Sequence, residues 1–137
     1  MITFQFILPG PACISFDDWS ELRSVDLSMF CTNQVTDFQA MFNHCLKLES
    51  VNLSSFDTRN AKSFAAMFHL CKSLKTLDIS NFSSLNLAGQ PQGAEGMFNR
   101  CYDLTKLDLG SFDLSVCGTS AAMLWLSKLS KNCAIRC

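Results

Sequence analysis

The stretch that decides the fold is Met41-Phe42-Asn43-His44-Cys45-Leu46-Lys47-Leu48-Glu49-Ser50-Val51-Asn52-Leu53-Ser54-Ser55-Phe56-Asp57-Thr58. The same pattern recurs from Met67 to Phe82 and from Met97 to Phe112. Equivalent leucines stand at Leu22, Leu48, Leu74 and Leu104, and the first three of them are evenly spaced. One constant period therefore runs through the chain, and it is interrupted by a four-residue insertion between Phe82 and Met97.

Each unit combines two hydrophobic patterns. The pattern Leu-x-x-apolar-x-apolar alternates like a half-buried strand, which predicts adjacent parallel strands over 24–28, 50–54, 76–80 and 106–110. The second pattern places apolar residues at i, i+3, i+4 and i+7, as one face of a short helix does. It predicts helices of about two turns near Met41, Met67, Met97 and Met123. The expected fold class is an α/β repeat solenoid, leucine-rich-repeat-like, with a short parallel sheet on one face and short helices on the other.

The whole chain, 1–137, is expected to be a single domain of about four units. Residues 1–21 are interpreted as an N-terminal cap or partial repeat, in which Trp19 replaces the repeated Cys and seals the end of the core. Residues 125–137 are interpreted as a C-terminal cap or partial repeat. They include an expected strand near 132–135 that aligns Cys133 with Leu107 and Ile135 with Leu109.

Composition excludes several classes of protein. The net charge is −1, so the chain lacks the basic excess that nucleic-acid binding requires. No stretch reaches 18 consecutive apolar residues, so we expect no membrane span, and the N-terminus lacks the basic start of a convincing signal peptide. Ten of the 12 phenylalanines occupy repeat positions, which predicts a stacked aromatic core.

The repeated Met-Phe-x-x-Cys-x-x-Leu motif, as in Met41–Leu48, resembles the 26-residue bacterial surface protein repeat of the BspA-like leucine-rich repeat family. The resemblance covers about residues 15 to 124. It implies a short solenoid within a secreted or surface-anchored protein linked to adhesion, and therefore a cell-surface or extracellular location. It implies no catalytic chemistry.

The cysteines and histidines give no pattern typical of catalysis or metal binding, so we predict no enzyme activity, no metal and no cofactor. Cys45, Cys71 and Cys101 recur on the expected buried face, which favours packed free thiols over disulfides. The adjacent His44 points about 100° away from Cys45 on a helix, which argues against a catalytic pair. The disulfide state of the other cysteines stays open; these are Cys13, Cys31, Cys117, Cys133 and Cys137.

The best candidate for function is the exposed side of the expected strands, here called the strand face. Its residues are Ser24, Asp26, Ser28, Ser50, Asn52, Ser54, Thr76, Asp78, Ser80, Lys106 and Asp108. We expect a non-catalytic module that binds a protein or glycan there, since repeat proteins bind along extended surfaces. Two alternatives remain: these short polar residues merely solvate the sheet and form turns, or the chain is a structural spacer that stacks end to end with further repeats. The insertion around Leu87–Gly93 is expected to bulge from one edge.

Overall fold

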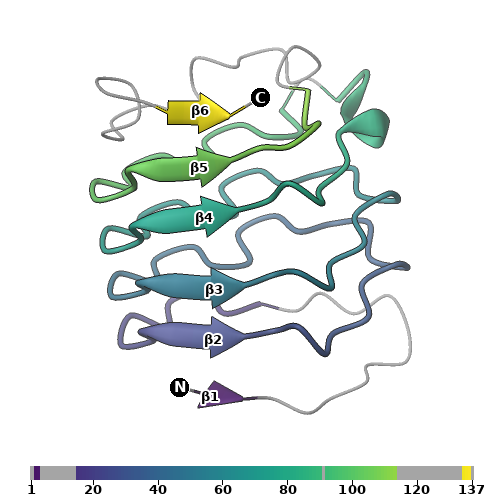
Figure 1. Cartoon of the computed structure of the whole chain (residues 1–137). Helices are drawn as coiled ribbons and strands as arrows, with labels where there is room; N and C mark the ends of the chain where they lie inside the picture. The colour runs from purple at the N-terminus through teal and green to yellow at the C-terminus, as the bar shows by residue number, and fades with distance from the viewer. Residues whose placement is uncertain (1, 4–14, 91, 114–133, 137) are drawn as a thin grey trace.

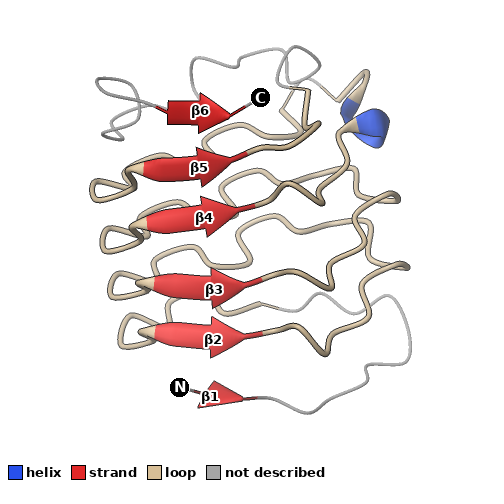
Figure 2. Ribbon diagram, in the orientation of Figure 1, coloured by secondary structure: helices blue, strands red, loops and turns tan. Residues whose placement is uncertain are grey.

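The chain winds through stacked coils, each about one sequence repeat long (Figure 1). The structure is a computed structural model that describes residues 2–3, 15–90, 92–113 and 134–136. The elements, in chain order, are β1 (Ile2–Thr3), β2 (Ser24–Asp26), β3 (Ser50–Asn52), β4 (Thr76–Asp78), the 3-10 helix η1 (Leu85–Leu87), β5 (Lys106–Asp108) and β6 (Ala134–Arg136). Turns and loops connect them on every side (Figure 2).

The strands are parallel, and each residue pairs with the equivalent residue of the next repeat. This register arises because every coil places the same repeat position at the same point across the sheet. Val25 lies opposite Val51 and Leu77 lies opposite Leu107. The predicted strand segments therefore do contain strands, but each strand has only three residues rather than five. β6 confirms the expected C-terminal strand with a shifted register, since Ile135 pairs with Leu107 and not with Leu109.

The expected fold class, an α/β repeat solenoid with one sheet and a layer of short helices, is wrong. The described strands form two separate three-stranded sheets, β1-β2-β3 and β4-β5-β6, with no ladder between β3 and β4. Among the described residues the helical structure consists of η1 alone, which has three residues. The helices predicted near Met41, Met67 and Met97 are absent, and the one predicted near Met123 lies outside the described residues.

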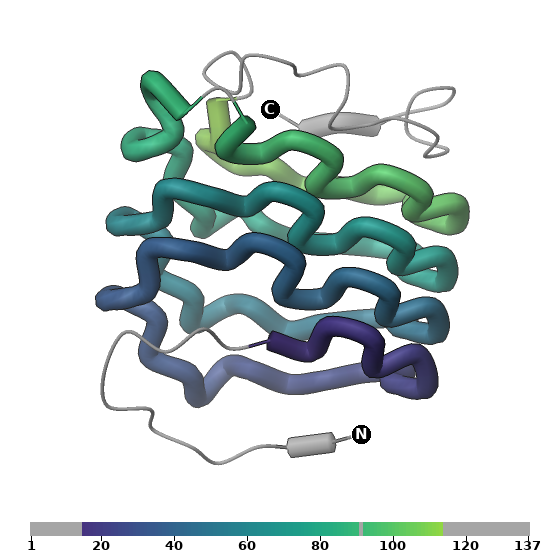
Figure 3. The backbone as a smooth tube through the Cα atoms, turned by 180° about the vertical axis from the view of Figure 1, so that it is seen from behind, coloured from purple at the N-terminus to yellow at the C-terminus, as the bar shows by residue number. Residues whose placement is uncertain are grey.

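Tandem turns replace the predicted helices on the side opposite the strands, here called the rear side (Figure 3). The amide of Cys45 donates to the carbonyl of Phe42 at 3.2 Å, which closes a four-residue turn, and Met41 closes the preceding turn on Phe38 at 3.3 Å. The third residue of each turn has a positive φ, +55° at Ala40 and +60° at His44. An i to i+3 bond with a left-handed third residue fits the type II turn.

Hydrogen bonds between coils explain why turns form in place of a helix. The amide of Phe42 donates to the carbonyl of Met67 at 2.8 Å, and that of His44 donates to the carbonyl of His69 at 2.9 Å. In a helix both amides would be directed at carbonyls four residues earlier in their own segment. Two tandem turns still direct the residues at i, i+3, i+4 and i+7 inward, so the same sequence pattern fills the core without a helix.

The core consists of phenylalanine columns that cross the coils. Phe16, Phe42, Phe68 and Phe98 form one column in which consecutive ring centroids lie 5.3, 5.3 and 5.9 Å apart and the rings are within 10° of parallel. Phe42, Phe68 and Phe98 are fully buried. The predicted aromatic core is thus confirmed. Trp19, the expected seal, contacts Phe16 edge-on at 5.4 Å while keeping 43% of its surface exposed.

The repeated cysteines are buried free thiols, as predicted. The Sγ atoms of Cys45, Cys71 and Cys101 each donate to a phenylalanine carbonyl of the preceding coil, at 3.0 to 3.1 Å. Burial raises the pKa of Cys45 and of Cys101 to about 12, so neither is a ready thiolate nucleophile. Cys31 is free and exposed; Cys13, Cys117, Cys133 and Cys137 lie outside the described residues.

Candidate functional site

The strand face is accessible, but its rows are interrupted. The parallel register brings Asp26 beside Asn52 and Asp78 beside Asp108. No strand ladder joins β3 to β4, so the predicted single row of four becomes two pairs. Along the strands and the residues that follow them, every predicted position is exposed or half-buried: Ser24, Asp26, Ser28, Ser50, Asn52, Ser54, Thr76, Asp78, Ser80, Lys106 and Asp108.

The carboxylates of this face also form turns. Oδ1 of Asp26 accepts the amide of Ser28 at 2.9 Å, and Oδ1 of Asp78 accepts the amide of Ser80 at 2.9 Å. The same bond is made by Asn52 to Ser54 at 3.1 Å and by Asp108 to Gly110 at 3.0 Å. These Asx turns end each strand by giving the amide two residues later a side-chain acceptor.

Hydrogen bonding lowers the pKa of two of these carboxyls. The backbone amide of Ser28 is the main cause at Asp26, and the hydroxyl and amide of Ser80 are the main causes at Asp78. Bonds of this kind favour the charged form of a carboxyl group. Both side chains therefore carry a full negative charge at neutral pH.

An ion-pair ladder lies at the start of the strands, and the sequence analysis missed it. Glu49 lies between Arg23, at 3.0 Å, and Lys75, at 3.4 Å, while Lys47 pairs with Glu21 at 2.6 Å. The pair of Glu49 with Lys75 crosses the gap between β3 and β4. Opposite charges one repeat apart in the sequence were the signal that would have revealed it. Such exposed pairs are individually weak, because solvent screens them and ordering two long side chains costs entropy.

The inserted segment forms one wall of an open pocket of about 460 Å³. Gln90 and Gln92 from the insertion line it together with Gln39, Lys62 and Glu95. The insertion does not simply bulge outward, because Leu87 at its start is fully buried. The pocket is open and has a mixed polar and apolar lining, and we assign no ligand to it.

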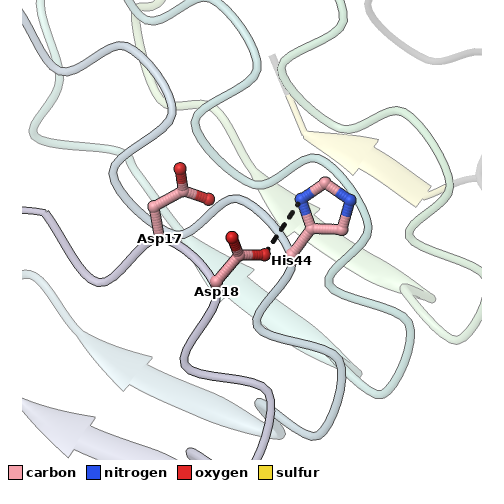
Figure 4. Close-up of side chains that lie close together, drawn as sticks. All are labelled: Asp17, Asp18 and His44. Carbon is pink, nitrogen blue, oxygen red and sulfur yellow. Dashed lines mark ion pairs between the residues drawn. The ribbon is translucent and has the colours of Figure 1, made fainter.

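Two consecutive coils place Asp17, Asp18 and His44 together on the rear side, although His44 lies one repeat away from the two aspartates in the sequence (Figure 4). One ligand atom from each lies within 4.8 Å of the other two. Nδ1 of His44 is 3.6 Å from Oδ1 of Asp18. The sequence analysis considered His44 only as a partner of Cys45 and rejected that pairing. The matching of positions 18 and 44 at the repeat spacing was the signal for this contact.

His69 lies beside this cluster, one coil further along the chain. Its Nδ1 is 2.9 Å from Oδ1 of Asn43, and its ring meets that of His44 edge-on at a centroid distance of 5.8 Å. Partial burial lowers the pKa of His69, and the nearby His44 and Arg100 lower it further. His69 is therefore largely neutral at physiological pH.

Comparison with known proteins identifies a family without an assigned activity. No helix among the described residues is long and apolar enough to cross a membrane, in keeping with the prediction of no membrane span. No curated protein and no solved structure matches the chain significantly. A family model does match residues 14–134, nearly the whole repeat region. The chain therefore belongs to the family described as Mycoplasma protein of unknown function, DUF285.

Proposed function

We propose that the protein is a non-catalytic binding module of a cell-surface or secreted protein, and that it captures a protein or glycan ligand on the strand face. The resemblance to BspA-like adhesion repeats supports this assignment. The family match to residues 14–134 assigns no activity and is compatible with it.

The observation that carries the proposal is the comparison of Asn52 with the aspartates around it. Asn52 makes the same Asx turn as Asp26 and Asp78, so the turn requires a side-chain oxygen and not a negative charge. Folding therefore does not require the negative charges of the three equivalent residues, Asp26, Asp78 and Asp108. In the second sheet Asp78 and Asp108 are direct cross-strand neighbours, where like charges repel. A basic ligand group bound between them would relieve that repulsion.

The proposal is tested with the double variant Asp78→Asn and Asp108→Asn. Asparagine preserves both Asx turns and removes both charges. Binding is measured by surface plasmon resonance on immobilised collagen, fibronectin and laminin and on neutral polysaccharides. We expect the wild type to bind at least one of these surfaces and the variant to bind it at least about tenfold more weakly, a loss of about 1.4 kcal/mol.

The matched control removes two negative charges elsewhere, with Asp37→Asn and Glu95→Gln. Oδ1 of Asp37 accepts the amide of Gln39, so asparagine also preserves that turn. The control should bind like the wild type. If the control loses binding and the strand-face variant keeps it, the site lies at the pocket beside the insertion. If the wild type binds none of the surfaces, the alternative of a structural spacer in a longer array is favoured.

A further inference from the structure

We propose that Asp17, Asp18 and His44 bind one divalent transition-metal ion of the zinc type, which links the rear turn at residues 16–19 to the rear turn at residues 42–45 in the next coil. The site lies on the side opposite the strand face, so it is independent of the function proposed above. It differs from the sequence prediction of no metal, which considered His44 only beside Cys45 and not beside Asp17 and Asp18.

Coil stacking sets the positions of the ligands. Asp18 and His44 are equivalent residues of consecutive coils, and both have left-handed backbones, with φ of +62° and +60°. The amide of Asp18 donates to the carbonyl of Asn43 at 2.9 Å, which fixes the two turns side by side. The side chains of Asp18 and His44 therefore leave neighbouring backbones with the same orientation, and Asp17 adds a second carboxylate from the same turn.

The distance between Asp18 and His44 suits two ligands of one ion better than a hydrogen bond. The separation of 3.6 Å between Nδ1 and Oδ1 exceeds the usual hydrogen-bond range of about 2.7–3.2 Å. Two ligands that each lie about 2.0–2.1 Å from a tetrahedral zinc ion are separated by roughly 3.3 Å. A small rotation of either side chain spans the difference.

The state of the imidazole is an independent observation that favours a ligand. Nδ1 of His44 is itself inaccessible to solvent and has no hydrogen-bond partner in the structure, although 44% of the His44 side chain is exposed. A shielded polar atom without a partner costs free energy, so such atoms usually have a partner of some kind. A metal ion bound at Nδ1 would supply that partner, with the two carboxylates balancing its charge.

The donor set selects the class of ion. One imidazole nitrogen and two carboxylates suit zinc and related transition metals, whereas calcium and magnesium prefer an all-oxygen shell. Within the described part of the chain, the set occurs once. The positions that follow Asp18 and His44 in the next coils hold Leu70 and Arg100, which cannot complete a second site.

The test is calorimetric titration of the untagged full chain with zinc chloride. We expect one zinc ion per chain and no comparable binding of magnesium or calcium. The variants Asp18→Asn and His44→Asn should each weaken zinc binding at least about tenfold, since even lost outer contacts to a metal site cost that much. Asparagine is chosen because it tolerates a positive φ, so both variants are expected to fold.

Three matched controls make the result specific. His69→Gln removes the neighbouring histidine, Asp37→Asn removes a carboxylate outside the cluster, and Cys31→Ser removes the exposed thiol. All three should bind zinc like the wild type. Zinc should also raise the melting temperature of the wild type but not of Asp18→Asn, because a ligand that binds only the folded state stabilises it.

Several outcomes would overturn the site. They are a wild type that binds no zinc, binding that disappears with Cys31→Ser or His69→Gln, and undiminished binding by both Asp18→Asn and His44→Asn. Cobalt substitution provides a further check, because a thiolate-to-cobalt absorption band would show that cysteine binds the metal.

Discussion

At the scale of single residues, the rear turns depend on left-handed backbones at residues other than glycine. Six such residues are described: Asp18, Ala40, His44, Ala66, Leu70 and Arg100. A left-handed backbone costs an L-residue roughly 1–2 kcal/mol relative to its preferred conformation. At the equivalent position of the fourth unit Gly96 adopts the same conformation, with φ of +63° and no Cβ. The strain is tolerated because, in each of these turns except that of Asp18, the first and the last residue of the turn are buried in the core.

Replacement of Ala66 by glycine should stabilise the protein. Ala66 has φ of +53°, and Ala66→Gly removes the clash of Cβ with the backbone, which should outweigh the greater entropy of the unfolded chain. We expect the free energy of unfolding in urea to rise by about 0.5–1 kcal/mol. Ala65→Gly is the matched control, because Ala65 has a negative φ and should lose stability. If Ala66→Gly lost as much stability as Ala65→Gly, the backbone of Ala66 would not be strained.

At the scale of elements, each strand is short because an Asx turn follows it directly. After Asp108 the chain continues through Gly110, whose φ is +54°. A Cβ at Gly110 would lie 2.4 Å from the carbonyl oxygen of Ser80, so only glycine fits this close approach. The strands thus contribute few ladder hydrogen bonds. The side-chain acceptors at their ends therefore supply a substantial share of the hydrogen bonds that hold each strand and its turn.

The contribution of one Asx turn is measurable at Asp78. We expect Asp78→Ala to lower the free energy of unfolding by about 1 kcal/mol, the usual value of a hydrogen bond. Asp78→Asn keeps the acceptor and should change stability at neutral pH by less than about 0.5 kcal/mol. Both free energies of unfolding are measured by urea denaturation. Equal losses of stability in the two variants would show that Asp78 stabilises the fold through its charge and not through the turn.

The same carboxyl predicts a pH dependence. Hydrogen bonds from Ser80 lower the pKa of Asp78 in the folded protein below 3.8, so the folded state binds this proton less readily than the unfolded state. Its contribution is fully present above pH 3.8 and is lost as the pH falls through the lowered pKa. Acidification should therefore destabilise the wild type more than Asp78→Asn, as urea denaturation at a series of pH values would measure.

At the scale of the whole molecule, stability depends on continuity of the core between coils, because the strands do not provide it. The two sheets are unpaired between β3 and β4, yet the rear amides of Phe42 and His44 bond across this junction to Met67 and His69. Phe42 and Phe68 also stack across it at 5.3 Å. The rear turns and the aromatic columns therefore join the two halves of the described structure.

Removal of the central ring should test this continuity. Phe68 is fully buried between Phe42 and Phe98, and Phe68→Ala should cost roughly 3–5 kcal/mol. That loss approaches the whole stability of a small domain, so the variant is expected to be largely unfolded by circular dichroism. Phe68→Leu should fold with a smaller loss. A loss below about 1 kcal/mol in Phe68→Ala would show that the column is not the main core.

The sequence by itself determined the repeat, the inward residues and the free buried thiols. Leu27, Phe68 and Cys71 are all fully buried, as the repeat period predicts. These features follow from which residues are apolar and how they recur, so they do not depend on the backbone between them. For the strand face the sequence identified the exposed positions correctly, since residues such as Asp78 alternate with buried ones.

Only the tertiary structure decided that the rear side consists of turns. Phe38, Met41, Phe42 and Cys45 satisfy the helical spacing, and tandem four-residue turns direct the same positions inward. Local propensity favours the helix at Ala65, Ala66 and Met67. The choice depends on carbonyls of the next coil, which accept the rear amides that a helix would use internally. The gap between the two sheets and the contact of Asp18 with His44 also depend on how the coils stack. A stretch of sequence within one repeat carries no information about that stacking.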